Sequence, residues 1–272
     1  MNRLIYALTV LSVFASCANS YNVEGSSSVS SLDGSKLYIK TINGNELKNL
    51  DSCAVLHGAF HFSGVLDTIR MATLFIDNEG LLPMVLEQGD IRVKIDNAGQ
   101  SVSGTPMNDR LYEFLDKHKQ LSNRMSELSH RQSQMLLDGI DEDVINETLS
   151  AEAAKITKEE DRLVTTFIVD NFDNVLGPGV FMMITSGYRY PILTPQIEDI
   201  MSKATEKFKN NPYVQEYYRT ASENEARLQG FDVSPTDNGQ LTTDTQSAGS
   251  TSSLPMNNDS LAIGGKAGGL QP

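Results

Sequence analysis

The sequence predicts an α+β fold. An N-terminal antiparallel β sandwich or barrel-like sheet precedes a helical domain with a long antiparallel helix hairpin, and a disordered C-terminal tail follows. Three patterns predict this order: short alternating apolar runs come first, then apolar residues recurring every three or four positions, then a polar low-complexity segment. The predicted parts are a lipoprotein signal peptide at 1–16, a β domain at 17–105, a helical domain at 106–229 and the tail at 230–272.

Short strands joined by turns are predicted for the first part. In "KLYIKTI", at 36–42, apolar and polar residues alternate, and Asn43 and Gly44 follow as a hairpin turn because both residues tolerate positive φ. The stretch "DSCAVLHGAFHFSGVL", at 51–66, predicts two more strands. In "DIRVKID", at 90–96, the apolar residues share one face. Regular short strands of this kind predict an antiparallel sandwich or barrel.

The periodicity changes at residue 105. Thr105 can cap a helix and Pro106 suits its first position, and an apolar stripe with helical spacing follows. The stretch "LDGIDED", at 137–143, interrupts the stripe before a second helix of similar length, so the two form an antiparallel hairpin. Shorter helices are predicted around 180–186, 194–208 and 212–228.

The last segment is predicted to be disordered. It consists mainly of Ser, Thr, Asn, Asp, Gly and Gln, and no aromatic residue follows Phe231. Such a segment cannot bury enough apolar surface to offset a backbone entropy cost of about 1–2 kcal/mol per residue.

The net charge excludes two classes of function. It is -13 over 272 residues. A nucleic-acid-binding protein needs a basic patch that displaces counterions, and adhesion to an anionic membrane surface needs basic residues as well. The acidic balance therefore argues against a nucleic-acid-binding protein and against a protein that adheres electrostatically to an anionic membrane.

The N-terminus has the layout of a secretory signal peptide. Asn2 and Arg3 give a positive start, 4–14 is almost continuously apolar, and the small residues Ala15 and Ser16 follow. The apolar run is shorter than the roughly 20 residues that a transmembrane helix needs. No other stretch approaches that length, so no transmembrane helix is expected.

Cys17 follows this run directly and resembles the cysteine of a bacterial lipobox. In such signals the thiol is acylated with a diglyceride and the peptide is cut before the cysteine. Phe14 stands where leucine is usual. Cleavage after 18–20, which would start the chain at Tyr21, and a role for Cys17 as an apolar filler are the alternatives. We predict lipidation of Cys17, which places the protein in the cell envelope, facing the periplasm or on the cell surface.

A family resemblance covers roughly residues 21–121. The segments "YNVEG", "GSKLYIKT", "LDSCAVLHGAFHFSG", "MVLEQGDIRVKID" and "VSGTPMNDRLYEFL" resemble a domain of unknown function at the N-terminus of bacterial envelope lipoproteins. In Gram-negative bacteria this domain usually precedes a helical stretch and a thioredoxin-like domain of the TlpA or AhpC/TSA type. The chain has no tryptophan and no Cys-x-x-Cys, so the redox activity of that domain is not carried over.

Few residues qualify as chemical sites. Cys53 could be a reactive thiol or an intermolecular disulfide partner, but it lacks a cationic neighbour and is predicted to be a buried strand residue. The four-residue spacing of His57 and His61 would suit a metal on a helix, but a strand or turn is predicted here, where only a weak metal pair is possible. No third ligand is obvious, so polar-face histidines are predicted. His118 lies on an apolar helix stripe and is predicted to be a core residue. The acidic run at 141–143 fits a helix N-terminus better than a calcium loop.

The sequence therefore predicts a non-enzymatic, lipid-anchored envelope protein with a binding or accessory role. Its predicted partners are the membrane, through the N-terminal lipid, and an envelope protein. No cofactor, metal, nucleic acid or small-molecule substrate is predicted. The helix hairpin, with Met125 and Met135, is either a docking face or simply core. Two alternatives stay open. One is a docking or sensor component that acts with a separate thioredoxin-like protein. The other is a hydrolase that uses His118 with a helical carboxylate.

Overall fold

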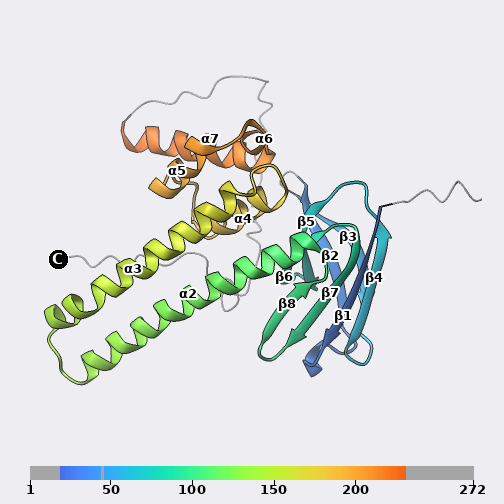
Figure 1. Cartoon of the computed structure of the whole chain (residues 1–272), viewed down its shortest axis with the longest axis horizontal. Coiled ribbons are helices and arrows are strands. Elements are labelled where there is room, and N and C mark those ends of the chain that lie inside the picture. The colour runs from blue at the N-terminus through green and yellow to red at the C-terminus, as the bar shows by residue number, and fades with distance from the viewer. Residues whose placement is uncertain (1–18, 44–45, 231–272) are drawn as a thin grey trace, which may run out of the picture.

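The computed structural model describes residues 19–43 and 46–230 (Figure 1). The signal peptide, Cys17 and the tail beyond Gly230 lie outside the described residues, so the predictions made for them stay predictions. Within the described part, a two-layer β sandwich comes first and helices follow, and a long hairpin of two helices extends away from the sandwich. The α+β prediction is confirmed.

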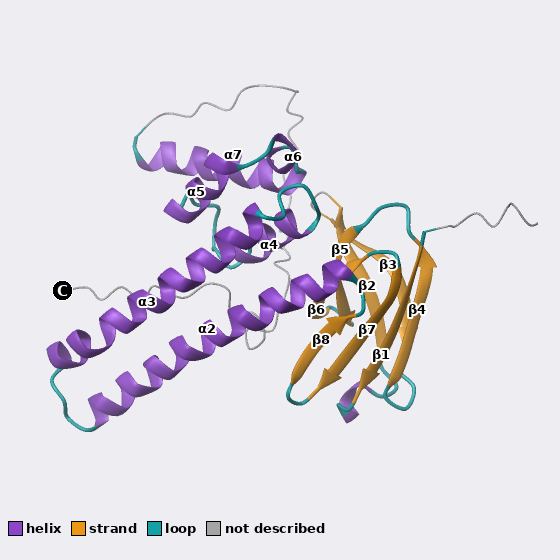
Figure 2. Ribbon diagram, viewed as in Figure 1, coloured by secondary structure: helices purple, strands orange, loops and turns teal. Residues whose placement is uncertain are grey.

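The sandwich consists of two four-stranded sheets (Figure 2). Sheet A has the order β4-β1-β7-β8 and sheet B has the order β3-β2-β5-β6. The strands are β1 (Ser20–Ser27), β2 (Lys36–Asn43), β3 (Glu46–Ala54), β4 (Ala59–Val65), β5 (Arg70–Ile76), β6 (Glu79–Leu86), β7 (Gly89–Asp96) and β8 (Gly99–Ser103), with a short 3-10 turn, η2 (Ser30–Leu32), after β1.

One strand pair departs from the antiparallel prediction. β1 runs parallel to β7, with Tyr21 opposite Gly89 and Ser27 opposite Ile95, whereas the other pairs are antiparallel. Parallel neighbours require a long crossover connection, and here five strands separate β1 from β7: β2 and β3 of sheet B, β4 of sheet A, then β5 and β6 of sheet B. The alternation within each strand carries no information about such a distant pairing.

The predicted hairpin turn at Asn43 and Gly44 includes a residue outside the described ranges, so it stays a prediction. The β3–β4 turn has positive φ values, and one strand was missed. His57 and Gly58, between β3 and β4, have φ values of 53° and 73°. β8 was not predicted, because its sequence GQSVS holds a single buried apolar residue, Val102, which is 1% exposed. A five-residue strand with one inward apolar side chain leaves no alternation to detect.

Inward-facing apolar side chains of both sheets form the core of the sandwich. In β7 the alternation of buried and exposed residues is regular, as predicted. The most deeply buried members of this core, each no more than 2% exposed, include Val23, Leu37, Ile39, Phe62, Leu74, Leu82, Met84, Ile91 and Val93.

Six described helices follow β8: α2 (Pro106–Leu137), α3 (Glu142–Val169), α4 (Leu176–Thr185), α5 (Pro195–Lys203), α6 (Glu206–Lys209) and α7 (Pro212–Leu228). α4 begins earlier than predicted, because the Asn174 side chain accepts the Leu176 N–H at 2.8 Å. The predicted helix at 194–208 is divided in two, since Ala204 is extended with ψ 134° and Thr205 caps α6 by accepting from Phe208. None of the described helices is long and apolar enough to cross a bilayer.

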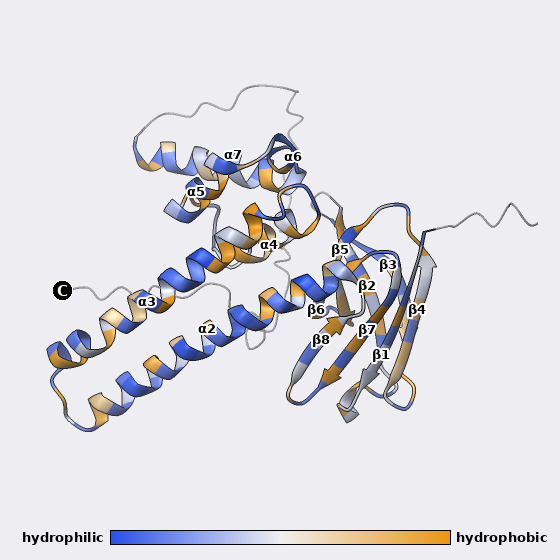
Figure 3. Ribbon diagram, viewed as in Figure 1, coloured by the Kyte–Doolittle hydropathy of each residue, from blue (hydrophilic) through white to orange (hydrophobic). Residues whose placement is uncertain are grey.

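The α2–α3 hairpin has a small core of its own. Leu121, Leu128, Ile145, Leu149 and Ile156 form it, and Met125 and Met135 pack against it as half-buried side chains. Figure 3 shows hydrophobic positions at intervals along two largely hydrophilic helices. The two methionines thus contribute to the core. The acidic run at 141–143 begins α3, where the Asp141 carboxylate accepts the Asp143 N–H, as predicted.

Candidate functional site

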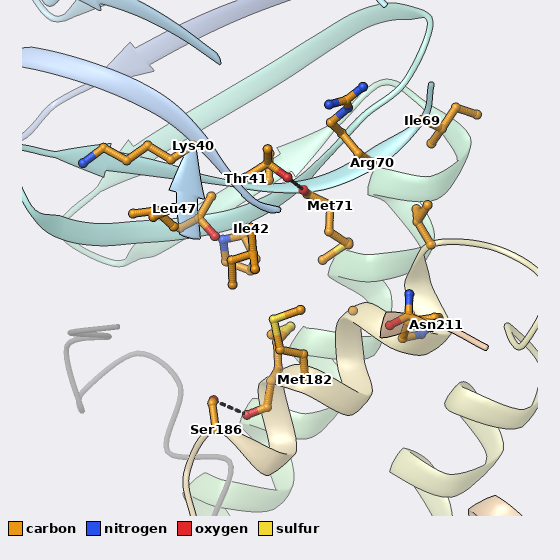
Figure 4. Close-up of a pocket in the computed structure, with 17 residues that line it drawn as sticks. Lys40, Thr41, Ile42, Leu47, Ile69, Arg70, Met71, Met182, Ser186 and Asn211 are labelled. Carbon is orange, nitrogen blue, oxygen red and sulfur yellow. Dashed lines mark hydrogen bonds between the residues drawn. The ribbon is translucent and has the colours of Figure 1, made fainter. Parts of the chain in front are cut away.

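A cavity of about 250 Å³ lies between the outer face of sheet B and α4 (Figure 4). Its walls come from β2, β3, β5 and β6 on one side and from α4 on the other, and Asn211 closes one margin. The apolar side chains that line it are Ile42, Leu47, Ile69, Met71, Ala72, Pro83, Val175, Pro178, Met182 and Met183. Most of the lining is therefore aliphatic or thioether.

The close approach of α4 to the sheet depends on Met71 and Gly179. A Cβ at position 179 would lie 2.6 Å from Met71 Cγ, so a larger residue there would force the Met71 side chain or the helix to shift. Met71 is fixed through its backbone, because the Thr41 hydroxyl donates to the Met71 carbonyl at 2.8 Å. The cavity thus lies beside a tight contact between helix and sheet.

Two cationic side chains, Lys40 and Arg70, border the cavity, and both interact with groups outside it. Lys40 donates to the Asp77 carbonyl at 3.0 Å and lies 4.6 Å from the centre of the Phe75 ring. Arg70 pairs with Asp67, and hydrogen bonds from Arg70 and the Thr68 N–H lower the pKa of that carboxyl. Figure 4 shows the charged end of Lys40 pointing away from Met182 and Ser186 on the opposite wall. The interior is thus suited to a neutral, apolar group.

A buried polar cluster joins the first turn of α2 to sheet B. The Asn108 side chain, which is fully buried, accepts the Val85 N–H at 2.8 Å and donates to the Val85 carbonyl at 2.8 Å. It also donates to the Thr105 hydroxyl at 2.8 Å. Glu87, 6% exposed, accepts the N–H groups of Met107 at 2.8 Å and Asn108 at 3.2 Å. We call these residues the Glu87–Asn108 cluster.

This cluster corrects the predicted cap of α2. Thr105 occupies the N-cap position, but its side chain makes no hydrogen bond to the helix N–H groups. The Glu87 carboxylate takes that role, and its negative charge is favourable at the positive end of the helix dipole. Tyr112, one turn later, donates to the Pro83 carbonyl at 3.0 Å, and burial raises the pKa of its phenol. The edge strand β6 is thereby covered by side chains of α2.

Cys53 lies on β3 as a half-buried free thiol. Burial raises its pKa and the nearby Asp51 adds to the increase, although a hydrogen bond from the His61 backbone lowers it. The Tyr21 hydroxyl donates to the Asp51 carboxylate at 3.3 Å, and burial together with this charge raises the pKa of Tyr21 to about 12. A raised pKa leaves less of the nucleophilic thiolate at neutral pH.

The predicted histidine pair is not brought together as a metal site. His57 lies in the turn before β4, whereas His61 lies within the strand, with its Nε2 2.6 Å from Asn22 Oδ1. Asn22 donates in turn to Asp90 at 2.9 Å. Across residues 19–43 and 46–230, no three His, Cys, Asp or Glu side chains gather in a metal-binding group.

His118 lies inside the hairpin, as its place on the apolar stripe predicted. It is 3% exposed, and its Nε2 lies 2.8 Å from Glu160 Oε1 on α3. The contact has the distance of an ion pair but not the angles of a hydrogen bond. His118 does not line the cavity beside α4. The arrangement favours a structural link between α2 and α3 over contact with a substrate.

Comparison with known families bears on the β sandwich. Residues 21–111 match the family model described as Domain of unknown function (DUF4369). This segment is a DUF4369 domain. The matched residues extend into the first turn of α2 and include Asn108, whose side chain accepts the Val85 N–H at the edge of β6. The chain has no match among curated proteins.

Sequence reasoning missed both the cavity and the Glu87–Asn108 cluster. The walls of the cavity come from 40–83 and 175–211, and no local pattern marks such a juxtaposition. For the cluster a signal existed, because "EQGD" and "TPMND" are among the segments that carry the DUF4369 resemblance. A buried Glu and a buried Asn in those segments could have been taken as partners of each other.

Proposed function

We propose that this chain is a non-enzymatic, lipid-anchored cell-envelope protein that binds an apolar partner group in the cavity beside α4. The observation that carries the binding role is the lining of that cavity, where aliphatic and thioether side chains face one another across a sheet and a helix. Thioether side chains adapt to varied shapes, and Met71, Met182 and Met183 border the space.

The anchoring part of the proposal is supported by the position of Cys17. It follows a short apolar run and two small residues, and it precedes the first described residue, Asn19, by only two positions. Lipid on this thiol would tether the DUF4369 domain directly, with almost no intervening chain. Each buried methylene of an acyl chain contributes about 0.8 kcal/mol, so several acyl chains hold even an acidic protein to a membrane.

Metabolic labelling with an alkyne fatty acid tests the anchor. Cys17→Ala removes the proposed attachment site, and Cys53→Ala is the matched control because Cys53 is the only other cysteine. Label is expected in the native chain and in Cys53→Ala, and it is expected to disappear in Cys17→Ala. A native chain without label would refute the anchor.

Binding of the neutral fluorophore N-phenyl-1-naphthylamine tests the cavity. Met182→Trp places a bulky ring in the space, whereas Leu137→Trp, at a position 88% exposed on the hairpin tip, changes a site remote from the cavity. Binding is expected to persist in Leu137→Trp and to weaken strongly in Met182→Trp. Equal binding by both variants would show that the probe occupies some other site.

A further inference from the structure

The first described residue of the chain lies at one end of the sandwich. The Asn19 carbonyl accepts the Leu66 N–H at 2.6 Å, and Ser20 pairs with Val65, the last residue of β4. In Figure 1, β1 begins and β4 ends at the same end of the sandwich, which we call the anchor end. Cys17 precedes Asn19 by two positions in the sequence, and two residues of extended chain span at most about 7 Å, so a lipid on Cys17 would be attached within that reach of the anchor end.

Exposed aliphatic side chains collect at the anchor end. Val65 is 76% exposed, Ile69 43% and Leu47 42%, and Ile69 and Leu47 both border the mouth of the cavity. Among the described residues of the two sheets and their loops, the other large exposed hydrophobic side chain is Leu56, 67% exposed, in the β3–β4 turn. That turn lies a strand length away, because β1 pairs with Val65 at one end and Ala59 at the other.

Topology explains why the three side chains meet. The loop from Leu66 to Ile69 carries the chain from β4 in sheet A to β5 in sheet B. β2 runs antiparallel to β5, so the end of β2 lies at the start of β5, and Leu47 of β3 lies opposite Ile42 near that end. Loops that are distant in sequence therefore share the end from which the N-terminal segment departs.

We propose that the anchor end is a membrane-facing surface, and that Val65, Ile69 and Leu47 enter the interfacial layer of the bilayer that holds the lipid on Cys17. The inference rests on the proposed anchor. Tethering keeps these side chains at the lipid surface, and burial of their exposed methyl groups then holds the domain in one orientation.

The charges around this surface agree with a lipid interface reached through a tether. The exposed loop carries Asp67 and Arg70 as an ion pair, so it adds no net charge beside the aliphatic side chains. The net charge of -13 opposes free adsorption to an anionic surface. Contact with the bilayer therefore depends on the anchor and on the aliphatic side chains together.

The test uses the full lipidated chain, reconstituted into phosphatidylcholine vesicles with brominated acyl chains. The chain has no tryptophan, so a single introduced tryptophan reports its own surroundings. Val65→Trp and Ile69→Trp are placed at the anchor end, and Leu56→Trp is the matched control at a similarly exposed site on the opposite end. Emission of the first two variants is expected to shift to the blue and to be quenched by the brominated lipid, while Leu56→Trp stays unquenched.

Flotation of the same vesicles separates the two proposals. Protein that fails to float with the vesicles would overturn both the anchor and the orientation. Protein that floats while Val65→Trp and Ile69→Trp remain unquenched would overturn the orientation alone. A blue shift without quenching would assign this surface to contact with a second copy of the chain, and it would likewise overturn the membrane-facing proposal.

Discussion

Removing the Asn108 side chain is expected to destabilise the whole β sandwich. In Asn108→Ala the Val85 N–H and carbonyl both lose their partner in a place where Val85 and Asn108 are 0% exposed. A buried backbone group left unpaired costs about 1–3 kcal/mol. Water that enters the vacated space can pair with one or both groups and so reduce the combined cost of the two. We therefore expect the free energy of unfolding to fall by about 3 kcal/mol. Against the roughly 5–15 kcal/mol that stabilises a typical domain, such a loss is large.

Urea unfolding of the full chain, followed by circular dichroism, measures this loss as a lower midpoint at an unchanged slope. Asn123→Ala, at an exposed position on the same helix, is the control and should leave stability unchanged or slightly increased. Asn108→Asp keeps the acceptor for Val85 but loses the donor, so it should be destabilised at pH 7 and recover partly as the carboxyl becomes protonated in acid. A loss below about 0.5 kcal/mol in Asn108→Ala would refute the reasoning.

Three further predictions follow from the same structure. Glu87→Gln keeps a hydrogen-bond acceptor for the first turn of α2 but removes the negative charge, so its free energy of unfolding in urea is expected to fall by about 1 kcal/mol. Glu87→Ala removes the acceptor as well and should lose more. Equal losses in the two variants would contradict the capping role. In a Cys17→Ala background, Cys53 should be alkylated by iodoacetamide at pH 8 more slowly in the native protein than in urea, because its raised pKa reduces the thiolate fraction; equal rates would refute this. Burial and Asp51 raise the pKa of Tyr21 from its ordinary value of 10.0 to about 12, so native stability is expected to fall between pH 10 and 12. Tyr21→Phe should lessen that fall and remove part of the tyrosinate absorbance change. An unaltered titration would show that Tyr21 ionises normally.

Local chemistry accounts for the elements that the sequence predicted well. The alternation in β7 matches its burial residue by residue, and α7 begins at Pro212 and ends at Leu228 as expected. These patterns are predictive because each strand or helix buries one face, and the spacing of its apolar residues along the sequence identifies that face. The division between α5 and α6 was missed because it depends on a single extended residue, Ala204.

Features that depend on distant partners could not be predicted in the same way. The parallel β1–β7 pair joins residues that are more than sixty positions apart, and Glu87 caps a helix that begins nineteen residues after it. The cavity requires that Met71 and Gly179 meet, which only the packed helix and sheet decide. The predicted role of Cys17, in contrast, depends on no distant partner, because it rests only on the residues that precede the cysteine in the sequence.

The covering of β6 by α2 has a consequence for how this protein can be divided. A fragment that ends at Thr105 would keep all eight strands but would leave the outer edge of β6 bare, with the Val85 and Pro83 backbone groups open to another chain. Bare edges of this kind recruit strands from neighbouring molecules and promote aggregation. A fragment that extends past Tyr112 carries its own edge protection, which makes the first turns of α2 a shield against self-association as well as the start of a helix.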